Sequence, residues 1–284
     1  MKSPPRFWRK LYLAAVLGVM YLPIILVILY SFNQSRLSFQ WQGFTFKWYA
    51  ELFADRTMFA ALRSSLILAL SSSCLATLIG ALGAAGGAAP KRKGRRGLIE
   101  SLSILPIIMP EIILGMLFLA YFKLLRLPPG MITLIIAHTA FCIPYVYLIV
   151  RGRLAGMDKS YTEAARDLGA GPVRAFMGIT LPLLRPAIIS GMLLSFAMSF
   201  DDLIISIFVT GPHTNTLPIR IYSQLKTGVS PKTNALCSLL FIVSALLGIL
   251  SLYMAGRSPA PGLRGGGVLG RGRLRAKRIR SVKK

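Results

Sequence analysis

Six long apolar runs alternate with polar or basic stretches along the chain. The first run holds about 22 residues, or ~33 Å of helix at ~1.5 Å per residue, which is enough to cross a ~30 Å hydrocarbon layer. Each of the other runs holds about 20 residues or more, which is the length that a membrane helix needs. The pattern predicts an all-α membrane protein with six transmembrane helices, at 11–32, 60–89, 102–125, 131–150, 186–209 and 234–254.

Basic residues divide the connecting segments into two classes. The N-tail at 1–10, the hinge Lys91–Arg96, the segment 151–185 and the C-tail are rich in Lys and Arg, whereas the alternate loops hold only a few. Because short basic loops stay in the cytoplasm, both termini are predicted to be cytoplasmic. The domain organisation is then a cytoplasmic N-tail at 1–10, a membrane domain at 11–255 and a disordered basic C-tail at 256–284. That C-tail either holds anionic headgroups or is simply solvated.

The composition is typical of a membrane protein and argues against a nucleic-acid-binding protein. Apolar residues make up 54% of the chain, and the mean hydropathy is +0.62. The net charge of +25 could indicate a nucleic-acid partner, but the basic residues lie between the apolar runs and in the tail, which is a topology pattern. No nucleic acid is therefore expected. The first run lacks a small-residue cleavage signal, so we expect it to remain as a helix.

Neither a metal site nor a disulfide is expected. The three cysteines, Cys74, Cys142 and Cys237, are widely spaced and fall in or beside apolar runs, where thiols pack as small apolar groups. His138 lies in the fourth run and His213 in a loop, and packing or surface positions are expected for both. The end of the second run is nearly all small residues. There Gly83 and Gly87 share a face, which predicts the close approach of another helix.

The segment 158–182 has the pattern of two short helices. Ser160 and Glu163 form a capping-box pattern, and Gly169 suits the left-handed end of the first helix. Pro172 suits the first position of a second helix that would run to about Ile179, after which Leu181 and Pro182 would turn the chain back to the membrane. Helices of about eight residues are marginal alone. Either a partner holds them or they pack on their own bundle.

Three acidic residues fall at membrane depth. An acidic side chain at mid-membrane costs about 2.5–3.5 kcal/mol, so such groups usually face a cavity or a partner. Glu111 would lie ~14 Å, and Asp201 ~24 Å, from the cytoplasmic start of its helix, so both could line one path that favours a polycation. Asp202 points ~100° away from Asp201 on a helix with 3.6 residues per turn, so only one of the two faces that path. Alternatively, Glu111 pairs with backbone freed by Pro110, and the Asp pair only breaks a helix.

The segment 158–182 also resembles a known family. Glu163-Ala164-Ala165, then Gly169, Ile179 and Leu181-Pro182, have the residue types and spacing of the EAA loop in the membrane subunits of ABC importers. Further segments resemble the PotC-type permeases of spermidine/putrescine (polyamine) importers: Ser31–Arg36, Trp41–Thr45, Lys47–Tyr49, Asp201-Asp202, Phe208–Pro212, Leu217–Tyr222, Val229–Pro231 and Asn234–Leu236.

The resemblance implies a type I ABC-importer permease in a bacterial inner membrane that translocates putrescine or spermidine. Its EAA loop would be the helix that couples it to an ATPase. The implied partners are a sister permease, two copies of a cytoplasmic ATPase, a periplasmic polyamine-binding protein and membrane lipids. The chain has no GxxxxGK[ST] phosphate loop, so it is expected not to be an enzyme; ATP and Mg²⁺ would bind the partner ATPase. A permease for another small solute, such as ferric ion or thiamine, and an ATP-independent channel or scaffold remain open alternatives.

Overall fold

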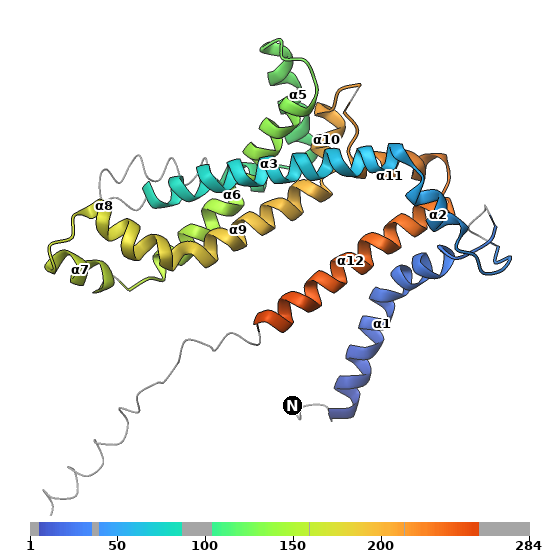
Figure 1. Ribbon diagram of the computed structural model, residues 1–284, viewed down its shortest axis with the longest axis horizontal. Coiled ribbons are helices and arrows are strands. Elements are labelled where there is room, and N and C mark those ends of the chain that lie inside the picture. The colour runs from blue at the N-terminus through green and yellow to red at the C-terminus, as the bar shows by residue number, and fades with distance from the viewer. Residues whose placement is uncertain (1–5, 36–39, 87–103, 159, 213, 256–284) are drawn as a thin grey trace, which may run out of the picture. The chain divides into compact units, whose positions relative to one another are not determined.

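A computed structural model describes residues 6–35, 40–86, 104–158, 160–212 and 214–255 (Figure 1). Within these ranges the chain is helical except for loops and one isolated bridge between Asn33 and Phe44, which confirms the all-α prediction. The helices are α1 (Arg6–Tyr30), α2 (Lys47–Phe53), α3 (Arg56–Gly86), α5 (Glu111–Leu124), α6 (Met131–Ala155), α7 (Ser160–Asp167), α8 (Pro172–Ala175), the π-helical η1 (Phe176–Thr180), α9 (Leu181–Asp201), α10 (Ile204–Val209), α11 (Leu217–Thr227) and α12 (Pro231–Ala255).

Four helical stretches in the described ranges are long and apolar enough to cross a membrane. They are Lys10–Tyr30, Arg56–Gly86, Met131–Ala155 and Pro172–Asp201, and a shorter apolar helix covers Pro231–Leu246. The number of six membrane helices and the orientation of the termini stay predictions. The basic hinge Lys91–Arg96, His213 and the C-tail at 256–284 lie outside the described residues. The chain divides into two compact units after Ala235, and the packing described below belongs to the first.

The third apolar run is broken, whereas one continuous helix was predicted over 102–125. Residues 104–108 are helical, Met109 and Pro110 are not, and α5 begins at Glu111. Proline has no backbone N–H to donate and disfavours helical geometry in the residue before it, which explains the break. Glu111 therefore begins a helix instead of lying in the middle of one, and the ~14 Å depth predicted for it no longer applies.

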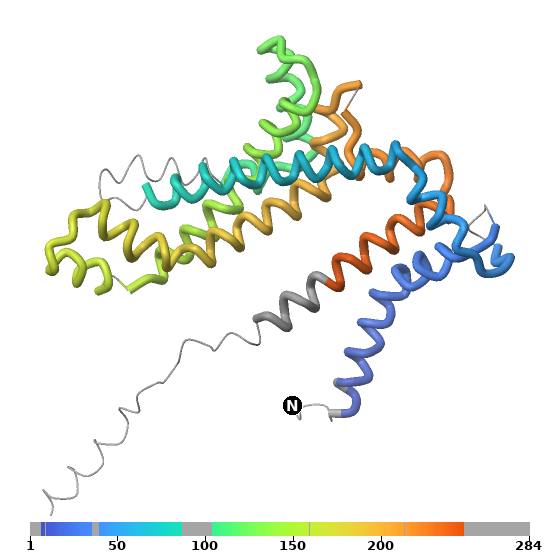
Figure 2. Tube along the Cα trace, viewed as in Figure 1, coloured from blue at the N-terminus to red at the C-terminus, as the bar shows by residue number. Residues whose placement is uncertain are grey.

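The fifth run starts earlier than predicted and is also broken. The chain does not turn at Leu181 and Pro182, because α8, η1 and α9 form one uninterrupted helical stretch from Pro172 to Asp201 (Figure 2). The predicted turn is wrong because a π-helical segment lies just before Pro182. π-helical turns are rare, but they occur as single-turn bulges inside α-helices that continue on both sides. The helix ends instead at Asp202, which is extended with ψ 124°, and α10 follows.

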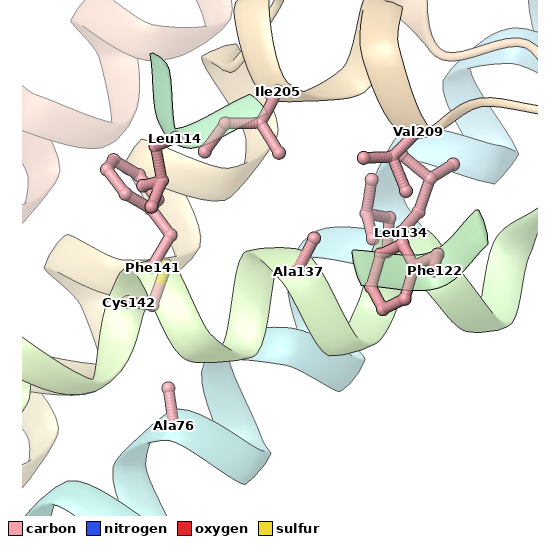
Figure 3. Packing of buried hydrophobic residues seen from close by; sticks show 10 residues of the cluster. Ala76, Leu114, Phe122, Leu134, Ala137, Phe141, Cys142, Ile205 and Val209 are labelled. Carbon is pink, nitrogen blue, oxygen red and sulfur yellow. The ribbon is translucent and has the colours of Figure 1, made fainter. Parts of the chain in front are cut away.

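The core of the first unit is made where α3, α6 and α9 pack against one another and α10 packs on α5 and α6. Figure 3 shows the larger of two apolar clusters, to which α3, α5, α6 and α10 contribute side chains. Fully buried Leu134 and Ala137 lie in its α6 part. The second cluster joins the end of α3 to the second half of α6 and to the start of α9. Both halves of the α9–α10 break are thus attached to α6.

The close approach of α3 to α6 lies at Gly80 and not at the predicted Gly83. A Cβ atom at Gly80 would lie 2.9 Å from Val146 Cβ and 3.0 Å from the Ile143 carbonyl oxygen of α6, whereas one at Gly83 would meet nothing nearer than 3.7 Å. Ala76 and Ala84, four residues to either side of Gly80, are fully buried. Small residues four apart do let two helices approach, but the face is 76/80/84. Gly87, the other predicted member, lies outside the described residues.

Candidate functional site

The first candidate site is the hairpin made by α7, the connection 168–171 and α8. As predicted, the first helix ends before Gly169, whose φ of +84° is in the left-handed region that glycine favours. The Ala170 N–H donates to the Ala165 carbonyl at 2.9 Å, and the Gly169 N–H donates to the Arg166 carbonyl at 2.9 Å. This pair of bonds is the Schellman arrangement, which ends a helix by satisfying its last carbonyl groups. Pro172 is the first residue of α8, as predicted.

The start of α7 differs from the predicted capping box. Ser160 is already helical, and its backbone N–H donates to the Asp158 carboxylate at 2.9 Å. Bonds from the backbone and side chain of Ser160 hold the pKa of Asp158 below its ordinary value, because they favour the charged carboxylate. The acceptor at this helix end is therefore Asp158, and the role of N-cap predicted for Ser160 is wrong. A carboxylate there also interacts favourably with the positive end of the helix dipole.

The residues of the EAA pattern divide into one that packs inside the hairpin and others that remain accessible. Ala165 is buried, in a helix that packs on α8 and η1. Glu163, Ala164, Gly169 and Pro182 are exposed, and Ile179 and Leu181 are half-buried. Large apolar side chains are exposed on the hairpin and at the start of η1, namely Leu168 (89%), Val173 (74%) and Met177 (58%). The hairpin therefore packs on itself and still presents an apolar surface with an exposed carboxylate.

The acidic candidates lie at the two helix breaks. Glu111 is the first residue of α5 and Asp201 is the last of α9, and both are exposed. The Glu111 carboxylate lies within electrostatic reach of Tyr145 on α6. A negative charge is favourable at the N-terminus of α5, whereas the negative end of the α9 dipole disfavours Asp201. A cation bound near Asp201 would relieve that repulsion.

Asp202 differs from its neighbour. Its side chain is only 3% exposed, and its two oxygens accept hydrogen bonds from the backbone N–H groups of Ile205 (3.3 Å) and Ser206 (2.9 Å) at the start of α10. Of the two residues, Asp202 is thus the one that caps the broken turn, and Asp201 is the one that remains accessible. His138 of α6 is buried as expected for packing, but it also contacts Ser199, Ser206 and Asp202. This serine cluster was not predicted, because its only signal in the sequence is a few polar residues within apolar runs.

In the described part of the chain, no three His, Cys, Asp or Glu residues are grouped so as to hold a metal ion. The three cysteines are free thiols, and only Cys142 is fully buried. Its thiol donates to the Ser195 carbonyl at 3.5 Å. The chemistry of these sites is therefore that of carboxylates, hydroxyls and an imidazole.

Comparison with known structures shows the fold. A chain of a bacterial ABC transporter that imports the acidic polysaccharide alginate superposes with a TM-score of 0.66 over 91% of this chain and 99% of its own, at 16% identity. The same kind of transporter, in complex with an alginate pentasaccharide-bound periplasmic protein, gives a TM-score of 0.62 over 89% and 97% at 17% identity. The MetNI methionine ABC transporter in an inward-facing form gives 0.54 over 69% and 95% at 15% identity. The fold is that of the type I ABC-importer permeases.

Proteins of similar sequence match this chain over most of its length, and they too are transport permeases. The spermidine/putrescine transport system permease protein PotC of Escherichia coli (strain K12) is 39% identical over 88% of this chain and 94% of its own length. The putrescine transport system permease protein PotI of the same organism is 38% identical over 91% and 93%. PotC of Haemophilus influenzae is 38% identical over 86% and 95%. The profile of the family described as "binding-protein-dependent transport system inner membrane component" matches residues 76–264, which include the hairpin and both helix breaks. The chain therefore belongs to the binding-protein-dependent inner membrane components, the permease subunits of ABC transporters.

Proposed function

We propose that this protein is the translocation subunit of an ATP-driven importer that carries putrescine or spermidine across a bacterial inner membrane. The observation that carries the proposal is the α7–α8 hairpin, a self-packed and exposed element at the head of the helix that leads to Asp201. We propose that the accessible residues of the EAA pattern, on the hairpin and on the helix that continues from it, dock on a separate ATPase: Glu163, Ala164, Gly169, Ile179, Leu181 and Pro182.

The physical support for docking is the surface that the hairpin leaves uncovered. Leu168 and Val173 are more exposed than apolar side chains usually are; Leu168 directly follows the eight-residue α7, and Val173 lies in the four-residue α8. Covering about 100 Å² of apolar surface is worth ~2.5 kcal/mol, so a partner groove would stabilise the hairpin considerably. Exposed Glu163 adds a charge that a basic residue of the groove could pair with.

The support for a polyamine cargo has two parts. Relatives at 38–39% identity over most of this chain carry spermidine or putrescine in their names. In addition, Glu111 and Asp201 are exposed carboxylates at breaks in apolar helices, where a cation would find a negative potential. The structural relatives named for alginate and methionine are too distant in sequence to bear on the cargo.

The complete machine in this proposal has more parts than one chain. The permease would cross the membrane six times with both termini in the cytoplasm. It would pair with a sister permease and receive cargo from a periplasmic binding protein. Two copies of the ATPase would hold ATP and Mg²⁺, and this chain would bind neither. Closure of the ATPase dimer would move the hairpins together and open the path outward, and hydrolysis would reset it inward.

The test is ATP-dependent uptake by the complex reconstituted in liposomes, with labelled putrescine and labelled spermidine measured separately. Glu163→Ala is expected to lower uptake at least tenfold while the complex still assembles, because it removes the exposed charge of the docking surface. Asp167→Asn is the matched control, since Asp167 is an exposed acidic residue of α7 outside the EAA pattern. Normal uptake by Glu163→Ala would refute the docking role. Uptake without ATP would favour a channel, and uptake of neither amine would refute the cargo.

A further inference from the structure

Buried polar side chains from three sides meet at the α9–α10 break. Ser72 of α3, His138 of α6, Ser199 of α9, and Asp202 and Ser206 at the break are all buried. Because buried polar groups must be hydrogen-bonded to be tolerated, the directions of these bonds are constrained. They form a chain that begins at a backbone carbonyl of α3 and ends at the Asp202 carboxylate.

The first bonds define the tautomer of His138. The Ser72 hydroxyl lies 2.7 Å from the Leu68 carbonyl oxygen, which can only accept, so Ser72 donates there. Ser72 Oγ must then accept the bond from Ser199 Oγ at 2.8 Å, which uses the Ser199 proton. Ser199 Oγ in turn must accept from His138 Nδ1 at 2.8 Å. With the Ser72 proton directed to the Leu68 carbonyl, the imidazole carries a proton on Nδ1.

The other ring nitrogen faces the Ser206 hydroxyl, which can donate only one proton, and a carboxylate oxygen, which can only accept when it is ionised. His138 Nε2 lies 3.1 Å from Ser206 Oγ and 3.4 Å from Asp202 Oδ2. A neutral imidazole with its proton on Nδ1 has a lone pair on Nε2, and an ionised Asp202 would direct a second lone pair at it inside an apolar bundle. One further proton removes this repulsion. It can sit on Nε2, which makes an imidazolium–carboxylate pair, or on Oδ2, which makes two neutral groups; in both forms the pair has no net charge.

We propose that His138 and Asp202 share one buried proton, and that His138 is thereby the positioning residue that holds the α9–α10 break. The pair joins α6 to the N-terminus of α10, while the Ser199–Ser72 bonds join the end of α9 to α3. Asp202 is then a structural group and not a ligand for cargo, and the break that it caps keeps Asp201 accessible. This inference concerns the break itself and does not depend on the identity of the cargo.

No other ionisable group near the pair compensates the charge of the Asp202 carboxylate. Asp201 precedes Asp202 and is exposed, and the Cys142 thiol of α6 is engaged with the Ser195 carbonyl. Within the described residues, His138 is the only basic side chain that the structure pairs with Asp202. The carboxylate therefore depends on the imidazole for its compensation.

The test is a double-mutant cycle on the unfolding temperature of the purified full-length complex. Asp202→Asn is expected to lower it by clearly less than His138→Leu does, because the amide N–H can donate to Nε2 and the amide oxygen can accept from Ile205, while only the Ser206 N–H loses its acceptor. His138→Leu is expected to lower it by ~6 °C or more, since it leaves a buried carboxylate without its partner. The double variant, with a neutral amide in that place, is expected to recover at least half of the loss. Asp201→Asn, the exposed neighbour, is the control and should leave the unfolding temperature unchanged or slightly raised, because it removes a negative charge from the C-terminus of α9.

Two outcomes would overturn the inference. If Asp202→Asn destabilises the complex as much as His138→Leu, the ionised carboxylate stabilises the break without a proton shared with His138. If the double variant is no more stable, or assembles no better, than His138→Leu alone, the two residues do not share a proton and His138 acts only by filling space.

Discussion

Replacing Gly80 by alanine tests the close packing of α3 on α6. The added Cβ would lie 2.9 Å from Val146 Cβ, 3.0 Å from the Ile143 carbonyl oxygen and 3.2 Å from the Tyr147 nitrogen. Carbon atoms pack best at ~3.5–4.0 Å, and two of these three neighbours are backbone atoms that no change of rotamer moves. The helices must therefore separate by several tenths of an ångström along their whole contact. Overpacking of this kind costs about 1–3 kcal/mol.

Gly83→Ala is the matched control because it makes the same chemical change three residues further along the same helix. Its Cβ would lie 3.7 Å from Tyr147 Cδ2, an ordinary contact. Both substitutions gain about 0.5–1 kcal/mol from removing a flexible glycine from a helix, so that gain cancels in their difference. The difference isolates the overpacking at Gly80, which is about 1–3 kcal/mol.

The assay is thermal unfolding of the purified complex in one detergent or lipid mixture. At ~2–4 °C per kcal/mol for a chain of this size, Gly80→Ala should unfold about 2–12 °C below Gly83→Ala. Gly83→Ala itself should unfold at or slightly above the wild-type temperature. The reasoning is refuted if the two variants unfold together, or if Gly80→Ala is the more stable.

Three further predictions follow from the sites. Gly169→Asn should retain more polyamine uptake than Gly169→Val, because asparagine tolerates the left-handed φ of +84° and a β-branched residue does not; equal uptake would contradict this. Glu111→Gln and Asp201→Asn should lower uptake more than they lower complex yield, and the acidic path fails if both transport normally. Asp55 caps α3 and lies 2.6 Å from Lys232 Nζ; these bonds hold its pKa well below the ordinary value, so the carboxylate form is stabilised by folding. The stability that wild type has over Asp55→Asn should therefore be complete above about pH 5 and decline as the pH falls below about 4. An advantage in unfolding temperature that grows on acidification would contradict that sign.

Helix type and several helix ends could be predicted because they depend on local chemistry. The apolar runs predicted an all-helical chain, Gly169 predicted the end of α7, and Pro172 predicted the start of α8. In each case one residue's conformational preference or missing N–H decides the outcome. Family membership could also be predicted, because it depends on the residues and spacing of the EAA pattern.

The internal breaks and the partners of polar groups could not be predicted in the same way. Pro110 breaks one helix while Pro182 does not, because a π-helical segment accommodates the second, and nothing local to either proline shows this. Asp201 and Asp202 are adjacent and chemically alike in sequence. Only the positions of α6 and α10 make one a buried cap and leave the other exposed. The choice of Gly80 over Gly83 likewise depends on where α6 crosses α3.

The continuity of the chain from Pro172 to Asp201 has a mechanical consequence. These 30 residues form a rod of ~45 Å with the α7–α8 hairpin at one end and the acidic break at the other. A helical rod without a loop is the simplest element that would carry a displacement of the hairpin to Asp201 if the hairpin docks as proposed. The π-helical turn Phe176–Thr180 lies near the hairpin end of this rod. The length of this rod and the position of the π-helical turn would then determine how far Asp201 moves for a given displacement of the hairpin.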